Sequence, residues 1–366
     1  LRDLIYKHKI TRLEFVPSLL SVFVATLKHG EKHYFESVTE ISNGGEILTP
    51  QLCKDTLELI PSASIHNYYG ATETTLVATT YQYNSTNTNT VSVGKPYDNY
   101  ALYILDNQKQ PLPVGAVGEI YIGGESIARG YLNKPELTKK CFIANPFATE
   151  QQHTEDTNQI IYKTGDLGYW LPDGNVEFVG RNDDQVKVRG FRIELGEIEV
   201  KLSSHPQIKK SVVLVKKRNN SNYLAAWYTA TNELQSDELH SYLSELLPDY
   251  MVPTTFMYQE TFPTNTNGKI DKKSLPEAKI TGSKHFIAPT TTTEKQLAEI
   301  WTNVLEVENI STNDNFFSIG GDSISVLLFV HRYEKQYNIK IPVNHLYKYK
   351  TLKALAEEID ANFAKY

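Results

Sequence analysis

The order of apolar and polar residues in the first 70 positions predicts strands that alternate with helices. Residues 10–27 (ITRLEFVPSLLSVFVATL) predict a short strand, a turn marked by proline and a helix. Residues 37–46 predict a strand that enters a glycine turn, residues 49–60 a helix with proline near its start, and residues 65–70 a strand that ends in glycine. This alternation indicates a mostly parallel sheet.

From about residue 91 the pattern changes to short strands separated by turn sequences. The segments ALYILD (101–106), GEIYIGG (118–124) and NVEFVGR (175–181) read as alternating strands, with PDG as one of the turns between them. This second pattern predicts a small β-barrel or sheet.

A third pattern begins after residue 184 and predicts a compact α+β unit of about 100 residues. Residues 193–205 predict a helix, 211–217 and 223–230 predict strands, and 236–247 predict a helix with Ser236 as the expected N-cap.

The last part of the chain predicts helices only. Residues 276–292 are polar and carry Pro, Gly and Thr, so they predict a linker. The apolar periodicity of residues 293–307, 323–337 and 352–366 then predicts amphipathic helices.

Composition excludes several classes of protein. Hydrophobic residues make up 40% of the chain, and the net charge is −6 with no long basic run, so a nucleic-acid partner is not expected. No apolar run approaches the roughly 20 residues that span a bilayer, and the charged start LRDLIYKHK does not resemble a signal peptide. We therefore expect a cytoplasmic protein without a membrane partner. The start in mid-pattern, without methionine, predicts a fragment of a longer protein.

The segment NYYGATETT (67–75) follows a predicted strand and carries side chains that suit a nucleotide. In an open parallel sheet, ligands bind at the carboxyl ends of the strands. Asn67 offers an amide, Tyr69 a flat ring, Thr72 a hydroxyl and Glu73 a carboxylate that can hold Mg²⁺ beside phosphates. A polar turn with a buried tyrosine is the alternative interpretation.

Two later segments carry further candidates for ribose or phosphate binding. In YKTGDLGYW (162–170), Asp166 follows glycine in a predicted tight turn, and a carboxylate can accept bonds from both ribose hydroxyls. In the segment 180–199, Arg181 offers a planar donor fork. A simple turn and a solvated edge strand are the respective alternatives.

The same segment 180–199 lies where two patterns meet, so a hinge at Asp183 and Asp184 is a reasonable expectation. Its basic residues are expected to alternate on one strand; they are Lys187, Arg189 and Arg192.

Two further candidates complete the set. They are Lys269, in the loop TNTNGKID (264–271), and Ser323, in GGDSIS (320–325). The Ser323 hydroxyl lies at a predicted helix start, where backbone amides and the helix dipole favour a phosphate. The alternatives are a solvated loop lysine and a Ser or Asp N-cap.

Six segments resemble, in chain order, the later signature motifs of nonribosomal peptide synthetase adenylation domains, which are members of the adenylate-forming superfamily. These segments are NYYGATETT, GEIYIGGESIARGYL, YKTGDL, GRNDDQVKVRGFRIELGEIE, LPDYMVPTTF and NTNGKID. DNFFSIGGDSI (314–324) resembles the phosphopantetheine site of the peptidyl carrier domain that follows them.

The resemblance implies a multidomain fold. An α/β part with a small β-barrel, the remnant of the large adenylation subdomain, is expected over residues 1–182, and an α+β lid subdomain over 183–280. A linker is expected over 281–290, and an all-α four-helix carrier bundle over 291–366.

The resemblance also implies roles for single residues. The nucleotide site would comprise the adenine contacts Asn67 and Tyr69, with Gly45 and Glu46 near the base, the phosphate contact Thr72, the Mg²⁺ ligand Glu73 and the ribose pair Asp166 and Arg181. The moving parts would comprise the hinge Asp183, Lys269 at the substrate carboxylate and α-phosphate, and Lys187 in the thioester-forming state. Ser323 would carry the 4′-phosphopantetheine arm.

The implied function is ATP-dependent activation of an amino acid, followed by loading of the aminoacyl group as a thioester on the arm at Ser323. The implied cofactors are ATP, Mg²⁺ and 4′-phosphopantetheine. The implied partners are a phosphopantetheinyl transferase and neighbouring condensation, epimerisation or release domains. Asp322 resembles the residue of carriers that precede epimerisation domains.

The family's earlier motifs, including a Gly/Ser/Thr-rich phosphate loop, do not occur in the chain, and Ala71 stands where the family commonly has proline. Two alternatives therefore stay open. One is an inert adenylation remnant that serves only as a carrier; the other is a carrier-linked carboxylic acid reductase or aryl-acid ligase module.

Matching the motifs also places part of a substrate pocket, made of Glu14, Ser42, Gly44, Tyr68, Leu76 and Val77. Glu14 could pair with a basic side chain such as that of ornithine or lysine. It could instead be hydrogen-bonded and structural, with Tyr68 narrowing the pocket for a small aliphatic amino acid. Burial of an unpaired charge is costly, so one of the two is expected.

Overall fold

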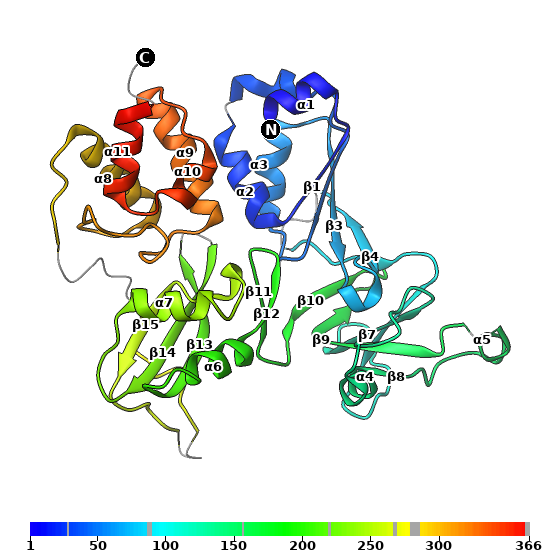
Figure 1. Cartoon of the computed structure of the whole chain (residues 1–366). Helices are drawn as coiled ribbons and strands as arrows, with labels where there is room; N and C mark the ends of the chain where they lie inside the picture. Colours follow the sequence, from blue (N-terminus) through cyan, green and yellow to red (C-terminus); the bar gives the residue numbers. More distant parts are fainter. Residues whose placement is uncertain are drawn as a thin grey trace. The chain divides into compact units, whose positions relative to one another are not determined.

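The computed structural model describes residues 1–27, 29–85, 90–155, 157–218, 221–265, 269–278 and 286–362. The chain divides into two compact units, Leu1–Gly190 and Phe191–Tyr366 (Figure 1). Residues 281–285 of the predicted linker lie outside the described residues. The domain boundary expected between residues 182 and 183 stays a prediction.

A five-stranded sheet in the order β1-β2-β3-β4-β5 forms the first part of unit 1. Its strands are β1 (Arg12–Phe15), β2 (Glu40–Gly44), β3 (Ser64–Tyr69), β4 (Thr79–Gln82) and β5 (Lys95–Pro96). The first three are parallel, as predicted, and β4 and β5 are added antiparallel.

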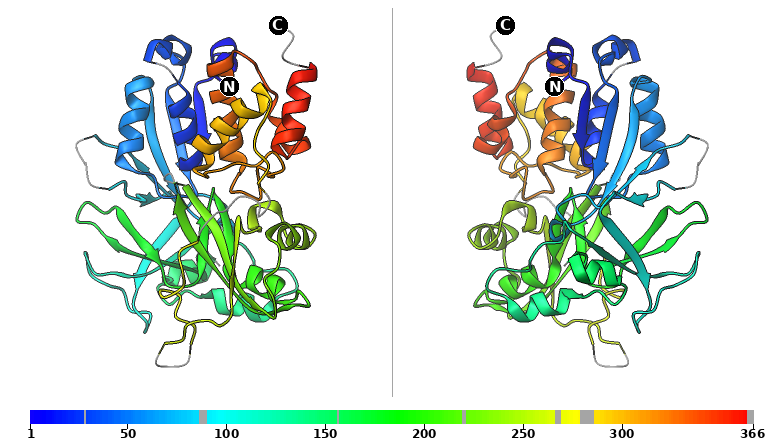
Figure 2. Two further views of the ribbon diagram at one scale, coloured as in Figure 1. Left: turned by 90° about the vertical axis from the view of Figure 1, so that its left-hand side faces the viewer. Right: turned by 90° about the vertical axis from the view of Figure 1, so that its right-hand side faces the viewer.

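Helices precede and connect the parallel strands, and their buried apolar residues form one cluster with those of the strands. They are α1 (Arg2–His8), α2 (Pro17–Thr26), η1 (His29–Phe35) and α3 (Pro50–Leu59). Proline begins α2 and α3, and the Thr49 hydroxyl caps α3 by accepting from Leu52 N at 3.3 Å. Phe15 stacks on Phe23 of α2, with ring centroids 5.3 Å apart. Figure 2 shows these blue strands with α2 and α3 beside them.

An antiparallel sheet in the order β10-β9-β7-β6, with β8 paired to β9, forms the second part of unit 1. It contains β6 (Tyr100–Leu105), β7 (Gly118–Gly124), β8 (Phe142–Ala144), β9 (Ile160–Trp170) and β10 (Val176–Arg181), with η2 (Thr72–Thr74) before it and α4 (Pro135–Cys141) and α5 (Glu150–Glu155) between its strands. The predicted barrel or sheet is thus present as an antiparallel sheet.

The tight turn predicted before Asp166 is wrong. Asp166 lies inside the long strand β9, and the register between β7 and β9 shifts between Glu119 and Tyr121. Gly165 has φ +77° at this shift. Glycine with a positive φ inside a strand produces a β-bulge, which bends the strand without ending it.

The expected alternation of Lys187, Arg189 and Arg192 on one strand is also wrong. Lys187 lies on β11 (Gln185–Val188) and Arg192 on β12 (Phe191–Glu194), and the two strands pair as a hairpin. Arg189 and Gly190 form the turn, with φ of 55° and 79°. Two successive positive φ angles are the geometry of a two-residue hairpin turn.

After β12, unit 2 continues with the predicted α+β elements. They are α6 (Leu195–Ser203), β13 (Ile208–Arg218), β14 (Ser221–Ala230), α7 (Ser236–Ser244), η3 (Asp249–Met251) and β15 (Thr255–Gln259). β14 pairs antiparallel with β13 and parallel with β15. Ser236 is the first residue of α7, whose N-cap is Gln235 without a side-chain bond, so the cap predicted at Ser236 is wrong.

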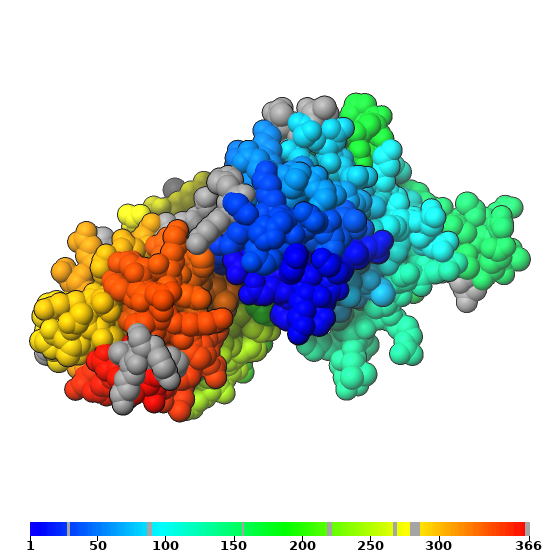
Figure 3. Space-filling model, turned by 90° about the horizontal axis from the view of Figure 1, so that it is seen from above, coloured from blue at the N-terminus to red at the C-terminus, as the bar shows by residue number. Residues whose placement is uncertain are grey.

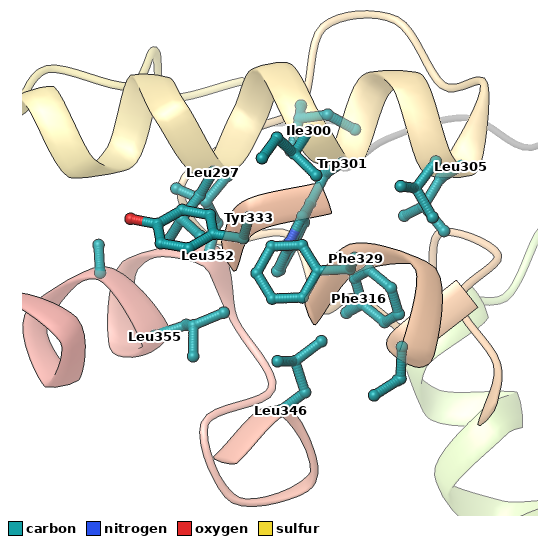
Figure 4. Close-up of a cluster of buried hydrophobic side chains, with 14 of the residues drawn as sticks. Leu297, Ile300, Trp301, Leu305, Phe316, Phe329, Tyr333, Leu346, Leu352 and Leu355 are labelled. Atoms are coloured by element: carbon teal, nitrogen blue, oxygen red, sulfur yellow. The ribbon is translucent and has the colours of Figure 1, made fainter. Parts of the chain in front are cut away.

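The described residues of the C-terminal part of unit 2 contain four helices, which confirms the predicted bundle. They are α8 (Thr292–Leu305), α9 (Ser323–Tyr337), α10 (Val343–Lys348) and α11 (Leu352–Asn362). Figure 4 shows the centre of the bundle, where Trp301 meets Phe316 edge-on with ring centroids 4.9 Å apart. The space-filling view of Figure 3 shows the C-terminal part of the chain in orange and red. None of the helices in the described ranges is long and apolar enough to cross a membrane.

Candidate functional site

The turn after β3 brings together most candidates of the segment NYYGATETT. Gly70 permits a very close approach, because a Cβ there would lie 2.3 Å from the carbonyl oxygen of Leu76. Thr75 and Leu76 both have positive φ, at 55° and 73°, which is unfavourable for side chains such as theirs. Backbone strain of this kind is concentrated at functional sites.

Asn67 and Asn43 are buried neighbours at the ends of β3 and β2, where they are paired in register. The Asn67 Nδ2 group donates to the carbonyl of Ser92 at 2.8 Å, whereas its Oδ1 atom is buried without a hydrogen-bond partner. Both amide atoms of Asn43 are buried and unpartnered as well. An unpaired buried acceptor beside the turn after β3 fits the predicted adenine contact, because an adenine amino group would supply a donor.

Tyr69, Asp166 and Arg181 form one hydrogen-bonded cluster. The Tyr69 hydroxyl donates to Asp166 Oδ2 at 2.6 Å, and the Arg181 guanidinium pairs with Asp166 Oδ1. Burial first, and the Asp166 carboxylate second, raises the pKa of the Tyr69 phenol, so this group acts as a donor. The structure thus brings together the predicted ribose pair and one of the predicted adenine contacts.

The predicted hinge residue Asp183 is attached to the same cluster. Arg181 donates from Nε to Asp183 Oδ1 and from Nη2 to Asp183 Oδ2, both at 2.7 Å. This two-bond geometry is the strongest form of an arginine–carboxylate pair. Arg181 therefore connects the predicted ribose site to the predicted hinge.

Glu73 is buried, at 7% exposure, although it carries a carboxylate, and Thr72 beside it is exposed. The Tyr131 hydroxyl donates to Glu73 Oε1 at 2.6 Å. No group of three or more His, Cys, Asp or Glu residues that could hold a metal occurs in the described part of the chain. A single carboxylate nevertheless fits Mg²⁺ that arrives with a nucleotide, because phosphates and waters supply the other oxygen ligands.

The predicted pocket residues Ser42 and Tyr68 are organised by Glu40, which sequence reasoning missed. Glu40 Oε1 accepts from the hydroxyls of Ser42, at 3.1 Å, and Tyr68, at 3.3 Å. Gly44 lies against Tyr68, since an added Cβ would be 3.3 Å from the Tyr68 carbonyl oxygen. The signal in the sequence was the period of two along β2, which places Glu40, Ser42 and Gly44 on one face.

The remaining pocket residues lie nearer to solvent. Leu76 is 72% exposed and Val77 is half-buried. Glu14 is exposed, and none of the described residues forms a hydrogen bond or ion pair with its carboxylate. The expected burial of Glu14 is therefore wrong, because β1 turns this side chain away from the face that packs on α2.

Gly45 and Glu46 follow β2, and Glu46 is held by backbone groups. Its Oε2 accepts from Ser18 N at the start of α2 at 2.9 Å, and its Oε1 accepts from Gly190 N at 2.7 Å. Gly45 has φ +83°, which forms the turn. Both carboxylate oxygens thus have structural partners, and placement near a base stays a prediction.

Of the two predicted lysines, one lies on a strand and the other lies beside a loop. Lys187 is half-buried on β11 of unit 1. Lys269 is exposed in unit 2, and its backbone N–H donates to Asn265 Oδ1 at 3.1 Å. Residues 266–268 of the predicted lysine loop lie outside the described residues.

Ser323 is the first residue of α9 and is exposed. The N-cap is Asp322, whose Oδ1 accepts from Ser325 N at 2.7 Å, while Asp322 N donates to the Ser325 hydroxyl. Among the described residues, none forms a hydrogen bond with the Ser323 hydroxyl. This geometry fits covalent attachment of a phosphopantetheine arm, because capping does not use the hydroxyl.

Comparison with known families gives two matches in chain order. Residues 1–132 match the family described as AMP-binding enzyme, and residues 295–359 match the phosphopantetheine attachment site. AMP-binding enzymes of the adenylating type use ATP with Mg²⁺, and attachment-site domains carry 4′-phosphopantetheine.

Curated relatives are peptide synthetases that are much longer than this chain. Tyrocidine synthase 3 of Brevibacillus parabrevis is 41% identical over 362 residues, which cover 98% of this chain and 5% of that protein. Bacitracin synthase 2 of Bacillus licheniformis is 43% identical over 354 residues, which cover 95% of this chain and 13% of that protein. The chain therefore spans only a small part of these relatives.

A solved structure shows the same fold. Holo-PA1221, described as a nonribosomal peptide synthetase protein containing adenylation and PCP domains bound to a vinylsulfonamide inhibitor, has a TM-score of 0.79 and 23% identity. The similarity covers 98% of this chain and 59% of that chain. The two family matches identify the chain as an AMP-binding enzyme segment followed by a phosphopantetheine attachment domain, and the relatives of this adenylation–carrier segment are peptide synthetases.

Proposed function

We propose that this adenylation–carrier segment activates an amino acid with ATP and loads it as a thioester on 4′-phosphopantetheine at Ser323. The observation that carries the proposal is the exposed Ser323 hydroxyl at the start of α9, which Asp322 leaves unbonded by capping the helix itself. A phosphopantetheinyl transferase would form the phosphodiester to this oxygen.

The residues around the Tyr69 turn support the adenylation step. The substrate carboxylate attacks the α-phosphorus of ATP, the bond from that phosphorus to the β-phosphate bridge breaks, and pyrophosphate leaves. Glu73 would hold the Mg²⁺ that offsets the phosphate charge, and Thr72 would contact a phosphate. Asn67 and Tyr69 would receive the adenine, and Asp166 with Arg181 the ribose.

Lys269 would offset charge at the substrate carboxylate and the α-phosphate during this step. The acyl group would then pass to the thiol that 4′-phosphopantetheine supplies when bound, and AMP would leave. Lys187 would serve this second step after a rotation at Asp183. Such a rotation requires that the two bonds from Arg181 to Asp183 break or move with the hinge.

The substrate class that we test at Glu14 is a basic amino acid such as ornithine or lysine. Glu14 is exposed and has no bonded partner among the described residues, so the structural role is without support, and its carboxylate is open to a basic side chain although water alone satisfies it. The hydrogen-bonded structural carboxylate is Glu40 instead. Glu14→Gln should lower loading of a basic amino acid relative to a neutral one, since a charge-assisted bond is lost.

The test is the intact mass of the chain after incubation with coenzyme A, a phosphopantetheinyl transferase, ATP, Mg²⁺ and mixed amino acids. A gain equal to the arm plus one amino acid supports the proposal and names the substrate. A gain equal to the arm alone supports the inert remnant that is used only as a carrier. A second incubation replaces the amino acids with aryl and aliphatic acids that lack an α-amino group, and loading of one of these would support a carboxylic acid reductase or aryl-acid ligase module.

A further inference from the structure

One short segment, Ser126–Tyr131, holds the turn that carries Glu73 by three bonds. The Thr75 hydroxyl donates to the carbonyl of Ser126 at 2.7 Å, and Ala128 N donates to the carbonyl of Glu73 at 2.9 Å. The Tyr131 hydroxyl donates to Glu73 Oε1 at 2.6 Å. The segment therefore fixes both the backbone and the carboxylate of this residue.

The turn needs support from outside because its own backbone is strained. Thr75 and Leu76 keep positive φ angles of 55° and 73°, and η2 is only three residues long. Such conformations are unfavourable and persist only when neighbouring structure imposes them. A further bond comes from the hydroxyl of Tyr100, which donates to the Thr74 carbonyl at 2.8 Å.

Tyr131 is itself fixed in one position. Its backbone N–H donates to the Thr138 hydroxyl at 2.9 Å, and its carbonyl accepts from Lys134 N at 3.2 Å. Its ring meets Phe142 edge-on, with centroids 5.4 Å apart at 74°. The phenol therefore reaches Glu73 from a backbone position that is bonded to residues at and within α4.

We propose that Tyr131 is a positioning residue that sets the orientation of the Glu73 carboxylate for Mg²⁺. The inference rests on the proposed function, in which Glu73 holds this ion. The last torsion of a glutamate side chain is broad, so a carboxylate without a donor samples many orientations. A fixed hydroxyl at 2.6 Å narrows that range before the ion arrives. Tyr131 contacts the carboxylate and acts on the metal only through it.

The experiment compares Tyr131→Phe with a matched control, Tyr121→Phe. Tyr121 is a buried tyrosine of β7 whose hydroxyl donates to another carboxylate, Glu119 Oε2, at 3.4 Å. The probe is Mn²⁺ together with a non-hydrolysable ATP analogue, with bound Mn²⁺ measured by electron paramagnetic resonance. Loss of a group that orients a metal ligand typically lowers the affinity for the metal about tenfold or more. We therefore expect Tyr131→Phe to lower the Mn²⁺ affinity by about that factor, and the control to lower it less than about twofold.

Two further variants show whether Tyr131 acts through Glu73. Glu73→Gln should weaken Mn²⁺ binding, and Glu73→Gln combined with Tyr131→Phe should bind no more weakly than Glu73→Gln alone, because coupled residues are not additive. All measurements are made below the unfolding temperature of every variant. The amount of Mg²⁺ that half-saturates adenylate formation should rise in Tyr131→Phe, and excess Mg²⁺ should restore the rate.

The outcomes separate the inference from the function on which it rests. If Tyr131→Phe bound Mn²⁺ with wild-type affinity, or if the losses of Mn²⁺ affinity were fully additive in the double variant, the positioning role would be overturned and the proposed function would stand. Wild-type affinity in Glu73→Gln would remove Glu73 from the metal site, and the inference would fall with it. A loss in Tyr121→Phe as large as in Tyr131→Phe would show a general packing effect and overturn the specific role.

Discussion

The turn at Glu73 and the start of α9 at Ser323 present their functional groups in opposite ways. The Glu73 carboxylate is buried, sits in a strained turn and accepts from Tyr131 at 2.6 Å. The Ser323 hydroxyl is exposed on a regular helix, and its neighbour Asp322 does the capping. A group that stabilises charge works best when it is fixed in advance. A hydroxyl that another enzyme modifies has to be reachable instead.

The largest expected effect is at Ser323. Ser323→Ala should abolish gain of the phosphopantetheine arm while stability changes by less than about 0.5 kcal/mol, because the residue is exposed. Ser325→Ala is the control: Ser325 is buried and shares the capping box with Asp322. The Ser325→Ala variant should gain the phosphopantetheine arm fully, while the free energy of unfolding of its carrier domain should fall by about 1 kcal/mol. Intact mass and urea unfolding measure both, and arm attachment in Ser323→Ala would contradict the assignment.

The next effect concerns the strained turn. Gly70→Ala would place a Cβ 2.3 Å from Leu76 O and 2.9 Å from Ala78 N, so the backbone must shift. We expect unit 1 to lose about 2–3 kcal/mol, with arm attachment at Ser323 unchanged. Gly30→Ala, with nothing within 4 Å, is the control. Hydrogen exchange resolved by peptide should show faster exchange in unit 1 only, and equal exchange in the two variants would argue against a tightly closed turn.

A smaller effect is expected at the cap of α9. Asp322→Ala removes the acceptor for Ser325 N and should cost the carrier about 1 kcal/mol, whereas Asp322→Asn keeps an acceptor and should cost less. Thermal unfolding measures the difference. Arm attachment should proceed in both variants. If the two substitutions were equally costly, the charge of Asp322 near the helix dipole would matter more than its hydrogen bond.

The smallest effect uses the two cysteines as reporters. Cys53 on α3 is fully buried, and burial raises the pKa of its thiol to about 12, whereas Cys141 is partly exposed. The thiolate is the reactive form, so alkylation near neutral pH should modify Cys141 first. Cys53 should react only when unit 1 opens, and faster in Gly70→Ala. Peptide mapping after timed iodoacetamide treatment tests this, and early labelling of Cys53 would show that α3 opens readily.

Local patterns were enough to predict most elements of the fold. The proline starts of α2 and α3, the parallel strands β1 to β3, and helices α8, α9 and α11 follow from periodicity and capping residues. The short helix α10 and the hairpin at Arg189–Gly190 were missed. A helix of six residues shows little periodicity, and the hairpin turn uses arginine where Asn or Asp is the usual signal.

The sequence by itself determined the order of motifs, the family they resemble and the residue types that carry the proposed chemistry. Only the tertiary structure decided which partners those residues have. The bonds of Tyr68 to Glu40, of Arg181 to Asp166 and of Tyr131 to Glu73 join positions that are 28, 15 and 58 residues apart. Such contacts depend on the register of paired strands and on where a bulge or strained turn directs a side chain. The spacing of residues in the sequence encodes the local periodicity of helices and strands but not these long-range contacts.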